Sequence, residues 1–123
     1  MASDTKQSAA TRVIALPVVG ERLSMHFGHC EAFELFDVDT TSKEVLNSRR
    51  LEPPAHQPGV LPGWLHQQGA ELVIAAGMGR RAQEMFEQAG IHVVVGAPSE
   101  SPREIIRAWL DGDLQAGENF CDH

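Results

Sequence analysis

Two patterns of apolar residues follow one another along the chain: short continuous runs rich in Val, Ile and Leu, and longer segments with apolar residues at helical spacing. The runs at 12–19, 32–39, 70–77 and 91–97 predict buried strands, because Val, Ile, Leu and Phe dominate them on both faces. The more polar run 44–50, after the turn TTSK, predicts an edge strand. Helices are predicted at 63–69, 79–90 and 101–114, the last with Ser101 as N-cap and Pro102 in its first turn.

The order of these elements predicts an α/β fold. Three strands come first, and the pattern helix–strand–helix–strand–helix follows. Strands joined through a helix run parallel, so we expect a five-stranded mixed sheet in the order 3-2-1-4-5 with strand 2 antiparallel. Helices on both faces complete three layers. We expect one domain over 12–116, a loose tail at 1–11 and a second tail at 117–123.

Four loops should meet at one edge of this sheet, because open α/β sheets bind ligands beyond the carboxyl ends of their parallel strands. These loops are GERLSMHFGHC (20–30), the proline-rich segment with His56, GMGRR (77–81) and GAPSES (96–101). Gly77 and Gly79 would let an anion approach the backbone at a helix N-terminus, and Arg80 and Arg81 would add positive charge. A purely structural role of these two glycines remains open.

Histidine and cysteine gather at two places in the chain. Imidazole and thiolate favour zinc, copper, iron and iron–sulfur clusters, so both places indicate a metal or metal–sulfur site. The spacing is not that of a zinc finger, because the chain has no Cys-X-X-Cys. Each residue taken alone could instead serve packing or face solvent, which is what we expect of His66 and His92. The candidate ligands are His26, His29 and Cys30, then Cys121 and His123, with His56 as an additional one.

Charge and composition exclude several classes of function. Ten basic and seventeen acidic side chains give a net charge of −7, and no basic run interrupts that acidity. We therefore expect neither nucleic-acid binding nor docking on anionic membranes. The first twelve residues lack the apolar core of a secretory signal, and no stretch is long enough to span a membrane. The expected location is the cytoplasm, with both cysteines as thiols or metal ligands.

Two catalytic interpretations fail on the residues. Cys30 beside His29 resembles a nucleophile with its base, but adjacent side chains rarely aim at each other and no orienting acid is evident. A two-metal nuclease needs carboxylates on the first and fourth strands, and the runs RVIALPVV and LVIAAG have none. We therefore expect neither of these two activities.

Several segments together resemble the dinitrogenase iron–molybdenum cofactor biosynthesis family. They are HFGHCEAFELFDVD, AHQPGVLPGWL, ELVIAAGMGRRAQEMFEQAGIHVVVGA, LDGDL and GENFCDH, and the likeness spans 12–123. The resemblance implies a ribonuclease H-like three-layer fold without nuclease activity. It also implies that the protein carries an anionic metal–sulfur cluster, the iron–molybdenum cofactor or a precursor, between donor and acceptor proteins. The resemblance therefore predicts a carrier and not an enzyme.

By position, the family likeness makes His26 of His-Phe-Gly the leading cluster contact, beside Gly28 and the 77–79 loop with Arg80. The Cys-Asp-His ending resembles that of a stand-alone branch of small proteins in the family, many of whose members have no assigned role in nitrogen fixation. Two alternatives remain: a mononuclear site for zinc or another divalent ion, and a metal-free interaction domain whose acidic surface binds a partner protein.

Overall fold

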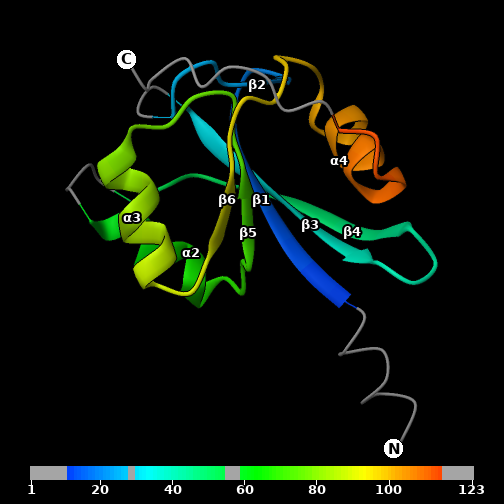
Figure 1. Ribbon diagram of the computed structural model, residues 1–123, viewed down its shortest axis with the longest axis horizontal. Helices are drawn as coiled ribbons and strands as arrows, with labels where there is room; N and C mark the ends of the chain where they lie inside the picture. The colour runs from blue at the N-terminus through cyan, green and yellow to red at the C-terminus, as the bar shows by residue number, and fades with distance from the viewer. Residues whose placement is uncertain (1–10, 28–29, 55–58, 115–123) are drawn as a thin grey trace, which may run out of the picture.

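One mixed sheet runs through the middle of the protein (Figure 1), which we describe from a computed structural model covering residues 11–27, 30–54 and 59–114. Its described strands are β1 (Thr11–Val19), β2 (Arg22–Leu23), β3 (Ala32–Asp39), β4 (Glu44–Leu51), β5 (Leu72–Ile74) and β6 (His92–Val94). The helices are α2 (Val60–Gln67), α3 (Arg80–Gln88) and α4 (Pro102–Asp111).

The strand order is β4-β3-β1-β5-β6, as the sequence predicts. β3 pairs antiparallel with both β1 and β4, whereas β5 pairs parallel with β1 and with β6. Burial explains this order, because the residues of β3 are mostly buried on both faces and those of β4 are mostly exposed. The central and edge positions are therefore confirmed.

The expected number of strands, the lengths of β5 and β6, and the start of α2 are wrong. The sheet has six described strands and not five, because the chain turns at Gly20 (φ 61°) and Arg22–Leu23 pair back onto the end of β1. A two-residue strand leaves no periodic signal in a sequence. β5 and β6 keep only three residues each. Helix α2 starts at Val60 and not at residue 63, since proline is tolerated in a first helical turn.

The sheet separates two hydrophobic cores, and this gives the three expected layers. Helix α4 covers one face, where Ile105, Ile106 and Leu110 pack on residues of the central strands. Helices α2 and α3 cover the other face with Leu65 and Phe86 (Figure 1). The structure thus confirms a mixed α/β sandwich, while the ribonuclease H-like assignment stays a prediction. No described helix has the length and hydrophobicity needed to cross a bilayer.

Candidate functional site

The loop after β1 is tied to the two loops that follow β5 and β6. The Phe27 N–H donates to the Gly77 carbonyl at 3.0 Å, and the Leu23 N–H donates to the Glu100 carbonyl at 3.0 Å. The Ser99 hydroxyl and the Arg22 guanidinium add further bonds between the first and last of these loops, at 3.0 and 2.9 Å. Convergence of these three loops at one sheet edge is confirmed (Figure 1).

Phe27 anchors this loop in the core under α2 and α3. Its ring is 9% exposed and meets Phe33 and Phe86 edge to face, with centroid distances of 5.7 and 5.4 Å. Such aromatic contacts add about 0.5–1.5 kcal/mol each beyond the area they bury. Phe27 stands between the candidate ligand His26 and the candidate cofactor-binding position Gly28, and it fixes the loop to the rest of the domain.

Ser24 holds the backbone of His26. Its hydroxyl donates to the His26 carbonyl at 2.7 Å, its N–H donates to Pro17 at 2.9 Å, and the residue is 3% exposed. His26 itself is exposed. The His26 imidazole therefore lies at the surface, while the buried Ser24 hydroxyl and the buried Phe27 ring fix the backbone on either side of it.

Removing that hydroxyl should loosen the loop. Ser24→Ala leaves the His26 carbonyl without this donor, so we expect the free energy of unfolding to fall by about 1 kcal/mol. Urea denaturation measures the fall, and amide exchange at residues 25–27 should rise with it. Ser99→Ala is the matched control, because its hydroxyl bonds the Leu23 carbonyl instead. Exchange that rises equally at residues 25–27 in both variants would contradict a specific role of Ser24.

The Gly77–Gly79 turn leads directly into α3. Gly79 caps the helix without a side-chain hydrogen bond, and a Cβ built there would meet nothing within 4 Å. The first N–H groups of α3 have no partner within the helix and follow directly after this glycine, and such groups are the backbone donors that an anion site uses. Arg80 and Arg81 are exposed, and within the described ranges neither forms an ion pair.

Cys30 is a less ready ligand than His26. It packs partly against the core under α2 and α3, and its N–H donates to the Phe27 carbonyl at 3.3 Å. Burial raises the pKa of the Cys30 thiol from 9.0 to about 11, against the smaller effect of a backbone hydrogen bond. The thiol is therefore protonated at neutral pH, and a metal would have to displace that proton to bind it.

The raised pKa predicts that the Cys30 thiol reacts slowly with alkylating reagents. The test uses a Cys121→Ser variant, in which Cys30 is the remaining cysteine. At pH 8 iodoacetamide should alkylate Cys30 about 100-fold more slowly in the folded protein than in the same variant unfolded in urea, because only the thiolate reacts. The same shift predicts stability that is full below pH 9.0 and declines as the pH rises toward about 11. A Cys30 that reacts as fast folded as unfolded would show that the thiol is not shielded.

The structure locates only part of the predicted ligand set. His26, Cys30, Gly77, Gly79 and Arg80 lie at the loop edge, and His66 and His92 are exposed as expected. Outside the described residues lie the remaining predicted positions: Gly28, His29, His56, Cys121 and His123. Within 11–27, 30–54 and 59–114, no three His, Cys, Asp or Glu side chains gather as a metal site would need.

Sequence reasoning missed the two residues that position the loop, Ser24 and Phe27. Phe27 carried a usable signal, because a lone aromatic between polar loop residues is commonly buried. Ser24 carried none, since a serine in a loop is usually exposed.

Known proteins resemble this chain over most of its length. A sequence model of the family described as "Dinitrogenase iron-molybdenum cofactor" matches residues 11–112. The uncharacterized protein MJ0580 of Methanocaldococcus jannaschii is 34% identical over 110 residues, which is 85% of this chain and 91% of that protein. The crystal structure of PH0822 superposes with a TM-score of 0.78 at 32% identity, covering 85% and 93% of the two chains.

A shorter match connects the chain with a much larger protein. The FeMo cofactor biosynthesis protein NifB of Sinorhizobium fredii is 29% identical over 77 residues, which is 58% of this chain and 16% of NifB. The family match, in contrast, takes in the β1 loop, the Gly77–Gly79 turn and the three helices among the described residues. The chain therefore belongs to the dinitrogenase iron–molybdenum cofactor family.

Proposed function

We propose that this protein is a non-catalytic carrier of an anionic metal–sulfur cluster, the iron–molybdenum cofactor or a related species. The observation that carries the proposal is the hydrogen bond that joins the His-Phe-Gly loop to the Gly77–Gly79 turn at the N-terminus of α3. This bond supports the proposal because it joins a loop that carries an imidazole to the N-terminus of a helix, and these are the two kinds of group that such a cluster would need. Membership of the family and the match to NifB support this cargo.

Each described part has a distinct task in the proposed binding. The N–H groups at the start of α3, with Arg80 and Arg81, attract the negative charge of the cluster. The exposed His26 imidazole supplies a metal bond, and Ser24 and Phe27 keep the backbone of His26 in place. Cys30 contributes only after losing its proton. Such sparse ligation suits a protein that receives its cargo from one partner and releases it to another.

The test is reconstitution without oxygen. Purified protein is incubated with iron–molybdenum cofactor extracted from nitrogenase, or with iron, molybdate and sulfide, and is then freed of excess by gel filtration. The expected result is visible absorption that elutes with the protein, with metal and sulfide in fixed ratio to chain. Protein that elutes colourless and metal-free would refute the proposal. Zinc bound one to one, without sulfide, would refute it in favour of a mononuclear site.

A further inference from the structure

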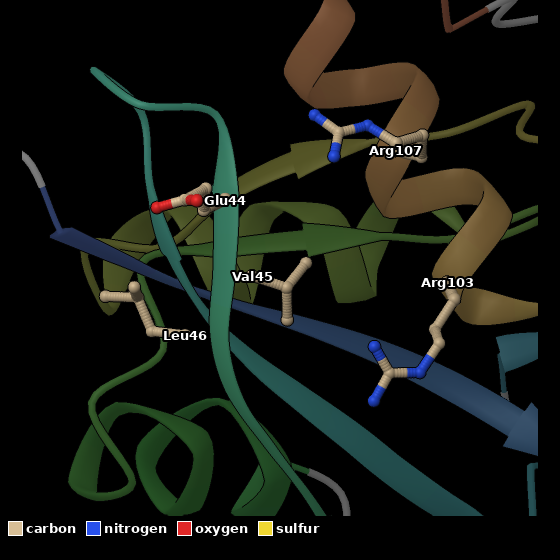
Figure 2. Close-up of a pocket in the computed structure, with 5 residues that line it drawn as sticks. All are labelled: Glu44, Val45, Leu46, Arg103 and Arg107. Atoms are coloured by element: carbon tan, nitrogen blue, oxygen red, sulfur yellow. The ribbon is translucent and has the colours of Figure 1, made fainter.

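A groove of about 570 Å³ lies between helix α4 and strand β4 (Figure 2). Its lining residues are Glu44, Val45, Leu46, Arg103 and Arg107. Glu44 pairs with Asp39, and Asp39 pairs with Thr11 at the start of β1. The groove therefore lies toward the end of the sheet away from the loops of the candidate site, which follow the end of β1.

Two exposed arginines from successive turns of α4 reach across to β4 and to the turn just before it. Arg107 donates to the Lys43 carbonyl at 2.6 Å and lies 3.3 Å from the Asp111 carboxylate. Arg103 lies 3.4 Å from the Ser48 hydroxyl and 5.9 Å above the Phe36 ring. These contacts hold the two guanidinium groups beside the two ends of the segment 43–48. Each guanidinium has five N–H donors, so both keep donors for a ligand.

The charge of the groove opposes that of the whole chain. Two arginines and one glutamate line it, and Asp111 balances part of the charge of Arg107, while the chain as a whole carries −7. Figure 2 shows the Glu44 carboxylate pointing away from α4, on the far side of β4 from both arginines. Within the described ranges Arg103 forms no ion pair. A ligand that fits this groove is therefore negatively charged on the side that faces α4.

The two arginines of α4 would form one part of a binding site, and the unpaired edge of strand β4 offers the other part. In the described sheet β4 pairs with β3 alone, so its other edge presents backbone N–H and C=O groups to solvent. Leu46 in this strand is 54% exposed. An extended segment that adds to such an edge gains main-chain hydrogen bonds, and contacts between its side chains and a neighbouring helix give specificity.

We propose that β4 and α4 form a docking site for an acidic, extended segment of a partner protein. The segment pairs with the free edge of β4 and directs carboxylates toward Arg103 and Arg107. Side chains of a strand alternate between two faces, so acidic residues at every second position would all meet α4. Arginine with carboxylate also forms stronger, charge-assisted hydrogen bonds.

The test uses the full chain and a blocked ten-residue peptide of alternating threonine and glutamate. Matched peptides carry glutamine or lysine in place of glutamate. We expect the glutamate peptide alone to bind, more weakly at higher salt, with amide protection spreading along residues 44–51. The double substitution Arg103→Gln and Arg107→Gln should weaken binding about tenfold or more. The control pair Arg12→Gln and Arg22→Gln removes the same charge outside β4 and α4 and should leave peptide binding unchanged.

Three results would overturn the proposal. The first is equal binding of the glutamate and glutamine peptides. The second is equal weakening by the two double substitutions, which would show a general charge effect. The third is self-association, in which β4 amides become protected as protein concentration rises without any peptide. The groove would then be an interface between copies of this chain. The groove variant should still take up cluster cargo, because the two sites are at opposite ends of the sheet.

Discussion

Replacing His26 with alanine is expected to lower the metal retained after anaerobic reconstitution by about tenfold or more, since a lost metal bond costs at least about 1.4 kcal/mol of binding. The imidazole is exposed, whereas the loop is held by Ser24 and Phe27. The fold should therefore survive the change. Metal and sulfide per chain, together with the visible spectrum, measure the result.

Two other histidines supply matched controls for this experiment. His66 lies in α2 and His92 at the start of β6, and both are exposed. Neither belongs to the loops at the carboxyl edge, so His66→Ala and His92→Ala should retain the wild-type metal content. Retention that falls equally in all three variants would indicate surface adsorption of metal and would remove His26 from the site.

Replacing Phe33 with alanine is expected to lower the free energy of unfolding by about 3–5 kcal/mol. The ring is fully buried and meets Phe27 and Trp64 edge to face, at centroid distances of 5.7 and 5.8 Å. Its loss leaves a cavity where β3, α2 and the site loop meet. Urea denaturation measures the change, which is a large share of the about 5–15 kcal/mol typical of a domain.

Phe36→Ala separates damage to the core from damage to the site. Phe36 is equally buried but belongs to the core under α4, on the other face of the sheet from Phe27. We expect a similar fall in stability, with amide signals of residues 24–27 left in place. In Phe33→Ala those signals should shift. Identical spectra of the loop in both variants would show that the aromatic contacts do not position it.

The sheet order could be predicted because burial and connectivity both constrain it. The branched runs at β1 and β3 are apolar on both faces, and the crossover rule decides the direction of β5 and β6. β2 could not be predicted, since two residues such as Arg22 and Leu23 form a strand only when a turn returns them to β1. The early start of α2 was hidden by Pro62, which sits in the first turn without disturbing the helix.

The location of the candidate site in the fold could be predicted better than the properties of its side chains. Topology alone brings the loops after β1, β5 and β6 to one edge, and the hydrogen bonds at Phe27 and Leu23 confirm it. Residue type made His26 and Cys30 candidate ligands, but the difference between an exposed imidazole and a shielded thiol depends on packing that no local spacing encodes. The same holds for Ser24, whose importance comes from a partner two residues away and from burial.

The bonds from the β1 loop to Gly77 and Glu100 also constrain when the site can exist during synthesis. A chain emerging from the ribosome exposes its first loop long before either acceptor carbonyl has left the exit tunnel. Until then the His-Phe-Gly segment lacks both of these anchors, and the α3 N-terminus is not beside it. If the proposed carrier function holds, cargo would be loaded only after Gly77 and Glu100 have emerged, so nascent chains stalled before residue 77 should not compete for it.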